Sequence, residues 1–410
     1  MLYCLSQNHL NIFSYKKQAI LLTWLLLIST VGLSYNWVKK ANFGGAARHR
    51  CTAFSVGNKG YVGGGHINSG VPVYHEDFWQ YDPGSDTWTQ IADFGGGKRY
   101  HSAAFSIGEF GYVGLGEDDV DEYHSDFYRY SPQYNIWQAI ADMPGHPRRG
   151  AASFVIDGFA YVGTGQTDFG YEDDFYKYDP DANAWYAVAD FIGEARSSAV
   201  SFSHNGKGYV GTGHIWGDHT KDFYEYDPVS NSWTQKADVG TTYRQDATGF
   251  VVGGKGYIGT GNDVDGNLNY KDFWEYDFDT DTWTQIPDLN AEGRRYMVSF
   301  VINGIAYAGT GTDGTNLKDF YMFDPSAASQ NELNQFTIAP YPNPSSDQIH
   351  FNFNGEAILI VIYSSEGKEV FRKRTQQNIT LSKQDFGKGI YYYLLRDEVG
   401  LTSNGKIIFL

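Results

Sequence analysis

A short motif returns six times along this chain of 410 residues at nearly even spacing. Tyr-Val-Gly-x-Gly, or a close variant of it, begins at Tyr61, Tyr112, Tyr161, Tyr209, Tyr257 and Tyr307. Successive copies therefore lie 48 to 51 residues apart. A repeat of this length is one structural unit that cannot bury its apolar face alone, so neighbouring copies must pack on one another.

Each copy contains four runs that are typical of short strands. The first ends near a Phe such as Phe154, and a tight turn such as Asp157-Gly158 leads into the Tyr-Val-Gly run. Asp-Gly supplies the positive φ that a two-residue hairpin needs. A variable loop, an Asp-Phe-Tyr run, a second turn and a run with a Trp such as Trp185 follow. Four antiparallel strands in each of six copies predict an all-β chain folded as a six-bladed β-propeller.

The sixth copy lacks its Trp, and the missing strand has a counterpart at the other end of the repeat region. Residues 34–48 match residues 85–99, which form the tail of the first complete copy, and Trp37 takes the place of Trp88. We therefore predict that residues 35–330 form the propeller and that its last blade is shared between the two ends, with Trp37 closing the ring. Closure removes two sheet edges that would otherwise invite aggregation.

The first 34 residues have the order of a signal peptide. Lys16 and Lys17 precede the mostly apolar run Ala19–Leu33, and small residues stand at Gly32 and Ser34. This run is short for a membrane span, so we expect cleavage after Ser34 and no permanent span. An uncleaved anchor is the alternative.

The chain changes character after residue 330. Residues 331–337 are predicted to be a polar linker. Residues 338–410 contain short apolar or alternating runs, such as Ala357–Tyr363 and Gly389–Leu395, at a spacing typical of a small β-sandwich.

The repeat resembles the kelch family. The resemblance rests on Gly-x-Gly after an aromatic-aliphatic strand, on the later Tyr-Asp and on the Trp six residues beyond that Asp. It covers about residues 35–330, and the second copy departs from it at Ser131, where the others have Asp. The resemblance implies a propeller fold.

The last domain resembles the C-terminal sorting domain of the type IX secretion system. The matching features are Tyr341-Pro-Asn-Pro344, the turn at Tyr363–Lys368, Gly389-Ile-Tyr391 and a lysine-bearing run that ends the chain. The resemblance implies the type IX secretion machinery as a partner. It also implies a protein that is secreted from a Gram-negative bacterium or held on its outer surface.

The loops between the second and third strands vary between copies, and we call the propeller face that carries them the loop face. Variable loops on a rigid scaffold often carry binding residues. Six arginines enter the first strands on this face and are expected to form a ring: Arg48, Arg99, Arg148, Arg196, Arg244 and Arg294. Such a ring could hold an anionic or carboxylate-bearing ligand. In the alternative, each Arg pairs with a repeat aspartate and pins the blades together: Asp93, Asp142, Asp190, Asp238 or Asp288.

Aromatic loop residues complete the expected ligand-binding set, namely Tyr123, Tyr171, Trp216 and Tyr270. They suit stacking on sugars or partner side chains, although exposed aromatics also pack loop on loop. Asp263 and Asp265 resemble the start of a calcium loop that lacks its closing Glu, and they are also ordinary turn formers. No cofactor is therefore expected beyond weak calcium binding there, and no other metal site is assigned.

The sequence predicts an exported or cell-surface binding or adhesion module whose partner is a protein or a glycan. The net charge of −17 and the lack of a basic stripe exclude a nucleic-acid partner. No nucleophile-and-base pair stands out, so no catalytic residue is assigned. The axial positions look alike in all six copies, whereas an active site normally breaks such symmetry, which argues against enzymatic activity. The alternative is a carbohydrate-active enzyme of the sugar oxidase, epimerase or isomerase type found on some kelch-like propellers, and a third hypothesis is a structural spacer.

Overall fold

The computed structural model describes residues 36–410 except 69, 326–339, 354–357, 366 and 397–401. The expected signal peptide (1–34) and linker (331–337) lie outside the described residues. The chain divides into two compact units, Met1–Ala327 and Ala328–Leu410. The described residues contain no helix with the length and apolar character that crossing a membrane requires.

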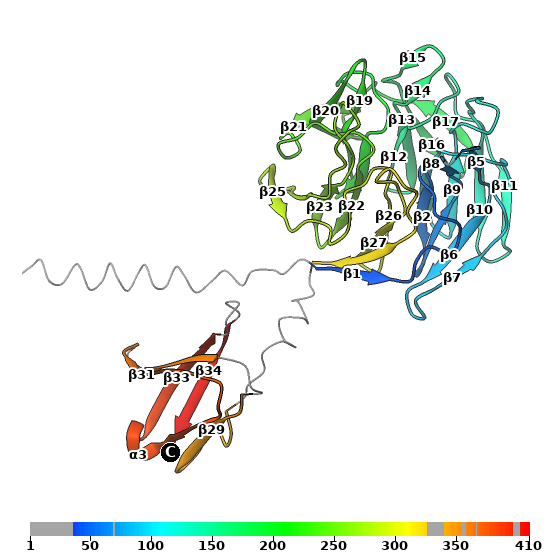
Figure 1. The fold of residues 1–410 in the computed structure, drawn as a ribbon. Coiled ribbons are helices and arrows are strands. Elements are labelled where there is room, and N and C mark those ends of the chain that lie inside the picture. The colour runs from blue at the N-terminus through cyan, green and yellow to red at the C-terminus, as the bar shows by residue number, and fades with distance from the viewer. Residues whose placement is uncertain (1–35, 69, 326–339, 354–357, 366, 397–401) are drawn as a thin grey trace, which may run out of the picture. The chain divides into compact units, whose positions relative to one another are not determined.

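The first unit consists of repeated four-stranded antiparallel sheets. The described part of residues 36–324 forms six of them around a central axis (Figure 1), and we number them sheets 1 to 6 along the chain. The prediction of an all-β chain of repeated four-stranded units is confirmed.

Sheets 1 to 3 have the following strands. Sheet 1 contains β2 (Thr52–Val56), β3 (Lys59–Gly63), β6 (Phe78–Asp82) and β7 (Thr87–Gln90). Sheet 2 contains β8 (Ala103–Ile107), β9 (Phe110–Gly114), β10 (Phe127–Ser131) and β11 (Ile136–Ala139). Sheet 3 contains β12 (Ala152–Ile156), β13 (Phe159–Gly163), β16 (Phe175–Asp179) and β17 (Ala184–Ala187).

Sheets 4 to 6 follow the same order, with one exception in the last. Sheet 4 contains β18 (Val200–His204), β19 (Lys207–Ile215), β20 (Asp218–Asp227) and β21 (Ser232–Lys236). Sheet 5 contains β22 (Thr248–Val252), β23 (Lys255–Gly259), β24 (Phe273–Asp277) and β25 (Thr282–Ile286). Sheet 6 contains β26 (Val298–Ile302), β27 (Ile305–Gly309), β28 (Phe320–Asp324) and, from the other end of the region, β1 (Asn36–Lys40).

The first strand of each sheet lies next to the axis and contacts the first strands of both neighbouring sheets. Large aromatic side chains fill the space between sheets, so glycines stand where a ring meets the next backbone. A Cβ atom at Gly60 would lie only 2.1 Å from the ring of Phe300, which belongs to the neighbouring sheet 6. This close approach explains the glycine before the Tyr of the repeat.

Strand β1 joins the two ends of the propeller region. It pairs antiparallel with β28, and Trp37 lies opposite Phe323. The Trp37 ring is buried, with centroid distances of 4.7 Å to Phe273 and 4.9 Å to Phe323. Its indole nitrogen is buried without a hydrogen-bond partner, whereas the indole of Trp88 donates to the Ala41 carbonyl.

The loops between the second and third strands carry further short hairpins. In sheet 1, β4 (His66–Ile67) pairs with β5 (Val73–Tyr74), and in sheet 3, β14 (Gln166–Thr167) pairs with β15 (Gly170–Tyr171). In sheet 4, the ladder of β19 and β20 itself extends into the loop. The loop face is therefore partly built from hydrogen-bonded hairpins.

The second unit is a small β-sandwich, as predicted. One layer pairs β29 (Gln348–Phe351) with β32 (Ile379–Ser382). The other has the order β31 (Glu369–Thr375), β30 (Ile358–Ser364), β33 (Gly389–Arg396) and β34 (Thr402–Phe409), and the short helix α3 (Lys383–Phe386) follows β32. Buried side chains of both layers, such as Ile349, Ile360 and Leu395, form one core.

Candidate ligand-binding site

The six repeat arginines are buried, with exposed fractions of at most 3%. Each guanidinium binds both carboxylate oxygens of the aspartate that begins the Asp-Phe run of the third strand in its own sheet; this aspartate directly precedes the strand, except in sheet 4, where Asp222 lies within β20. The pairs are Arg48–Asp77, Arg99–Asp126, Arg148–Asp174, Arg196–Asp222, Arg244–Asp272 and Arg294–Asp319. The Arg196 guanidinium also donates to the Thr212 carbonyl at 3.0 Å, within the second strand.

The backbone of each arginine contacts the preceding sheet. The Arg99 carbonyl accepts from the Gly65 amide at 2.8 Å, and the Arg48 carbonyl accepts from the Gly311 amide at 3.1 Å. Because the side chain binds its own sheet and the backbone binds the neighbour, each arginine ties two sheets together. The geometry favours the structural interpretation of the arginine ring over a ligand-binding one.

The predicted partners of the arginines are wrong. None of these pairs involves the aspartates predicted for this role, namely Asp93, Asp142, Asp190, Asp238 and Asp288. They follow the outermost strand of each sheet, and Asp238, for example, lies 3.5 Å from Lys221 with its side chain 44% exposed. The aspartate of the Asp-Phe run is nearer, because the third strand pairs with the second strand, whose carbonyl the same guanidinium binds.

A pocket on the axis is lined by the six residues that stand two positions after the repeat arginines. The six equivalent positions are Arg50, His101, Gly150, Ser198, Asp246 and Tyr296. All six have a positive φ, between 52° and 64°. This conformation is uncommon for residues other than glycine and costs on the order of 1 kcal/mol or more for a bulky side chain.

Backbone hydrogen bonds link these six positions around the axis. From His101 onward, the amide at each position donates to the carbonyl of the equivalent residue in the preceding copy, at 2.8 to 3.4 Å. The pairs are His101 to Arg50, Gly150 to His101, Ser198 to Gly150, Asp246 to Ser198 and Tyr296 to Asp246. The left-handed backbone is therefore fixed by contacts between neighbouring sheets, and the side chain at each position is left to vary.

The side chains at these six positions differ from one another, unlike those of the arginine ring. The expectation that the axial positions look alike is therefore wrong. The repeat motif hides the difference, because the residues that define it lie on both sides of these positions. The sequence signal that could have found the site is a position-by-position comparison of the copies.

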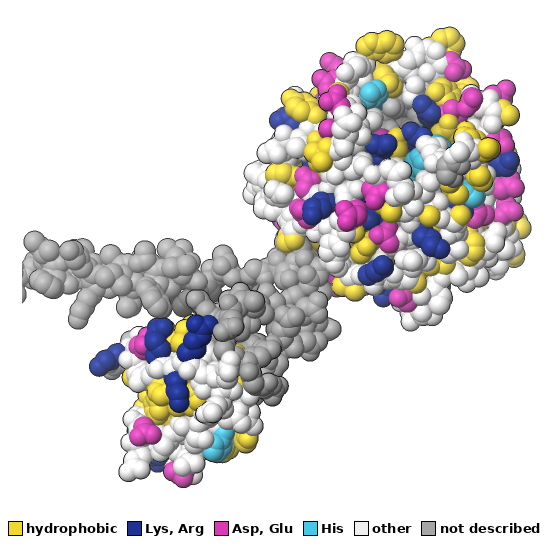
Figure 2. Space-filling view, viewed as in Figure 1, with side chains coloured by type: hydrophobic (Ala, Val, Ile, Leu, Met, Phe, Trp, Pro, Cys, Tyr) yellow, Lys and Arg dark blue, Asp and Glu magenta, His cyan; other side chains and the backbone are white. Residues whose placement is uncertain are grey.

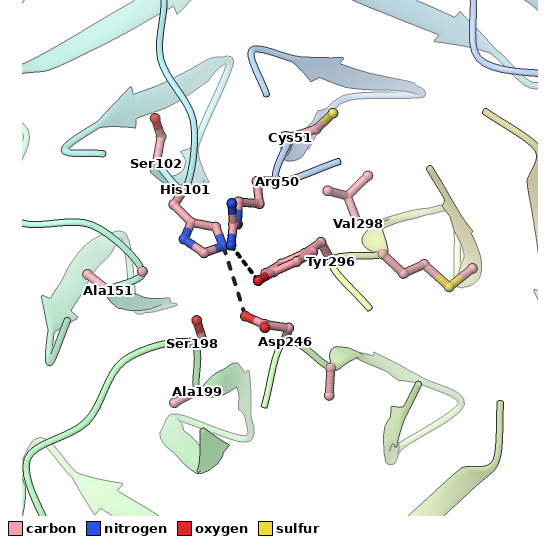
Figure 3. A pocket seen from close by; sticks show the side chains of 13 residues that line it. Arg50, Cys51, His101, Ser102, Ala151, Ser198, Ala199, Asp246, Tyr296 and Val298 are labelled. Atoms are coloured by element: carbon pink, nitrogen blue, oxygen red, sulfur yellow. Dashed lines mark hydrogen bonds and ion pairs between the residues drawn. The ribbon is translucent and has the colours of Figure 1, made fainter. Parts of the chain in front are cut away.

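The pocket has a volume of about 190 Å³, and its polar side chains come from different sheets (Figure 3). A guanidinium nitrogen of Arg50 donates to the Tyr296 hydroxyl at 2.6 Å. Across the pocket, His101 Nε2 lies 3.9 Å from Asp246 Oδ1. Asp246 Oδ2 and Arg50 Nε are buried without a hydrogen-bond partner. Buried polar atoms without partners are rare and costly, so a polar ligand would find open hydrogen-bonding positions here.

Burial shifts the ionisation of the pocket side chains. Burial and the charges of Arg50 and Arg149 hold the pKa of His101 well below its usual range, so its imidazole is neutral at pH 7. Burial also raises the pKa of Asp246 and raises that of Tyr296 to about 12. Such shifts in one pocket are typical of functional sites.

A second circle of unlike side chains surrounds the first. Its members are His49, Tyr100, Arg149, Ser197, Gln245 and Arg295, and they form β-bridges with His66, Glu117, Gln166, His214, Asn262 and Thr312, respectively. Arg149 makes an ion pair with Glu117 and donates to the Gln166 side chain at 3.0 Å. Figure 2 shows acidic and basic side chains interspersed over the visible part of the propeller.

The four predicted aromatic residues do not lie in one environment. Tyr270 lies beneath the Arg244 guanidinium at 4.8 Å, and Tyr123 lies beneath that of Arg149 at 5.5 Å. Tyr171 and Trp216 form an edge-to-face pair with ring centroids 6.3 Å apart, and Trp216 is 84% exposed. Trp216 is therefore the one of the four that presents its ring to solvent.

The predicted calcium loop forms a turn. The Asp263 carboxylate accepts a hydrogen bond from the Leu268 amide at 3.0 Å. No group of three or more His, Cys, Asp or Glu side chains suited to a metal ion is found in the part of the chain that the structure describes. Calcium binding at Asp263 and Asp265 stays a prediction.

Comparisons with known proteins agree with the architecture. Residues 47–95 match the kelch motif, and residues 339–409 match the secretion system C-terminal sorting domain. No curated protein matches the chain. The solved structure of YjhT is similar over 69% of this chain and 96% of its own, with 17% sequence identity and a TM-score of 0.59. At this identity the similarity concerns the fold alone.

A sorting domain of this family marks proteins that the type IX secretion system exports to the cell surface or the medium. The sorting domain also implies contact with that secretion machinery. The chain is thus an exported protein with a kelch-type propeller and a type IX sorting domain.

Proposed function

We propose that this exported propeller is a glycan-binding module that holds a carboxylate-bearing sugar in the axial pocket of its loop face. The observation that carries the proposal is the change of chemistry at one repeat position. Arginine, histidine, glycine, serine, aspartate and tyrosine occupy six equivalent left-handed positions around a single pocket. A purely structural position would be expected to keep one residue type, as the arginine ring does.

The charges around the pocket favour an anionic ligand. Arg50, Arg149 and Arg295 are the cations of the two circles, and Asp246 is their one acid; Glu117, the bridge partner of Tyr100, lies beside them. Arg149 and Glu117 neutralise each other, and burial shifts Asp246 towards its neutral form. The site is therefore locally positive within a chain of net charge −17. Guanidinium groups bind carboxylates through paired hydrogen bonds, which favours a carboxylate over a neutral hydroxyl.

Calorimetric titration of the purified protein with acidic sugars tests the proposal. Glucuronate and galacturonate would be compared with glucose and galactose, their neutral counterparts. We expect binding of at least one acid and a weakening of ten-fold or more in Arg50→Ala, because a hydrogen bond to a charged group contributes about 1.5–3 kcal/mol. Arg129→Ala, which alters a partly buried arginine of β10 outside the pocket, is the matched control.

Equal binding of the acidic and neutral sugars would contradict the proposed carboxylate preference. Absence of binding across a wider panel of acidic glycans would contradict the function itself. So would a ligand that binds Arg50→Ala as well as it binds the unaltered protein.

A second candidate function, an enzyme that moves protons on the bound sugar, is favoured by the facing pair of His101 and Asp246. The two side chains lie 3.9 Å apart across the pocket, and both have shifted pKa values. General acid–base catalysis needs two such groups within reach of one substrate. NMR of each bound sugar over time would reveal turnover. Loss of turnover in His101→Ala with binding retained would establish the enzyme over the pure binding module.

A further inference from the structure

The wall of the axial pocket is uneven. Sheets 3 and 4 are preceded by the small residues Gly150, Ala151, Ser198 and Ala199, whereas Arg50, His101, Asp246 and Tyr296 line the rest of its rim. Figure 3 shows Ala151, Ser198 and Ala199 along one side of the pocket, away from the Arg50 and Tyr296 side chains. The wall is therefore lowest on the side of sheets 3 and 4.

Two loop hairpins stand on this same side. The hairpin of β14 and β15 in sheet 3 carries Phe169 at its turn, and the long hairpin of β19 and β20 in sheet 4 carries Trp216 at its turn. Phe169 is 80% exposed and Trp216 is 84% exposed. Apolar side chains protrude in Figure 2 at the edge of the propeller where Figure 1 places β14 and β15.

Aromatic rings connect the low wall of the pocket to these turns. Ser197, the neighbour of Ser198, is bridged to His214. The His214 ring lies 5.3 Å from that of Tyr171, and the Tyr171 ring lies 6.3 Å from that of Trp216. A ligand that leaves the pocket over Ser198 would pass along this row of rings.

The chemistry of the row suits a sugar chain. Tyr and Trp present large rigid surfaces at low entropic cost, and the carbon-bound hydrogens of a pyranose give it an apolar face that can lie on such a ring. The pocket volume of about 190 Å³ is smaller than the roughly 300–1,000 Å³ of most ligand pockets. It therefore holds little more than one terminal residue, and any further residues must lie outside it.

We infer that the ligand is an oligosaccharide whose acidic terminal residue occupies the axial pocket and whose next residues run over sheets 3 and 4 against Tyr171 and Trp216. The inference rests on the proposed function, since it extends the same site. It assigns Trp216 to a second subsite that contributes affinity for chain length, while Arg50 contributes affinity for the terminal acid.

The test uses acidic sugars that are each offered in two forms, as the free monosaccharide and as the terminal residue of a tetrasaccharide; galacturonate and its oligomers are one such series. We expect the tetrasaccharide to bind at least ten-fold more tightly than its monosaccharide. Trp216→Ala should remove most of that ratio and leave the monosaccharide affinity unchanged, and Trp216→Phe should retain it in part. Val264→Ala, in the loop of sheet 5 on the same face, is the matched control.

The outcomes separate this inference from the function on which it rests. Equal affinity for both forms, or a chain-length advantage that Trp216→Ala leaves intact, would overturn the inference while the pocket keeps its function. Binding of neither form of any acidic sugar would overturn both. Since Trp216 is almost fully exposed, the variant is expected to fold, and an unchanged melting temperature verifies this.

Discussion

Replacing Arg196 by alanine tests how the sheets are held together. Its guanidinium binds the Asp222 carboxylate at 2.5 and 2.9 Å and is fully buried. Removing one partner of a buried ion pair costs about 3–5 kcal/mol, because the other charge is left unpaired. The Asp222 side chain is 22% exposed, so we expect the lower end, about 3 kcal/mol. At about 2–4 °C per kcal/mol for a large domain, the melting temperature of the propeller should fall by about 6–12 °C.

The pH dependence of this loss has a definite sign. Burial alone would raise the pKa of Asp222, but the hydrogen bond and charge of Arg196 outweigh it and lower the pKa. A carboxyl group with a lowered folded-state pKa stabilises the protein above its unfolded pKa of about 3.9, and this stability is lost as the pH falls through the folded value. The difference in melting temperature between the unaltered protein and Arg196→Ala should therefore be largest at pH 7 and decrease below about pH 4.

Differential scanning calorimetry measures both effects, with Arg129→Ala as the control at a partly buried arginine outside the ring. That control should change the stability by about 1 kcal/mol or less, well below the effect expected for Arg196→Ala. A melting temperature for Arg196→Ala within about 2 °C of the unaltered protein would refute the structural role. If the same variant also lost its sugar ligand, the arginine ring would be the binding site after all.

Three other changes have expected outcomes. Trp37→Ala should cost about 3–5 kcal/mol in chemical denaturation, because the ring is buried between Phe273 and Phe323, and an unchanged midpoint would refute the closing role of β1. Burial raises the pKa of the Cys51 thiol to about 12, so iodoacetamide at pH 8 should label it only after unfolding, as mass spectrometry would show. Asp246→Asn should raise the melting temperature more at pH 7 than at pH 4. Burial raises the folded-state pKa of Asp246, so its ionisation lowers the stability of the native protein as the pH rises through that value. The asparagine amide does not ionise, so the variant does not lose this stability. A lower melting temperature at pH 7 would count against this account of Asp246.

The repeat carries enough information to predict the sheets. Its turn dipeptides and alternating apolar runs follow from local backbone rules, so β12 and β13 lie on either side of Asp157-Gly158 as expected. The match between residues 34–48 and 85–99 likewise indicated the strand that contains Trp37, which the structure pairs with β28. These features depend on neighbours in the sequence or on a second copy of the same pattern.

The arginine partners and the pocket depend on contacts across the fold. Asp77 and Asp93 are both repeat aspartates, 29 and 45 residues beyond Arg48, and only the pairing of β3 with β6 places Asp77 beside the guanidinium. The pocket is harder still to predict from the sequence, because its six equivalent positions carry a different residue in each copy and so show no repeated pattern. Arg50 and Asp246 are 196 positions apart in the sequence and converge only when the ring closes.

The arginine ring and the circle of six pocket positions are separate sets of residues, which explains how a symmetric propeller can hold an asymmetric site. The six arginines stabilise the propeller, because their ion pairs are repeated in every sheet. Two residues further on, the left-handed backbone is held by amide–carbonyl bonds that do not depend on the side chain. A substitution at Arg50, Ser198 or Asp246 therefore alters the chemistry of the pocket and leaves these backbone bonds between sheets in place, although a variant at Arg50 also loses the side-chain hydrogen bond to Tyr296. Ser198→His should accordingly change ligand preference far more than melting temperature, and a large loss of stability would show that these positions are not free to vary.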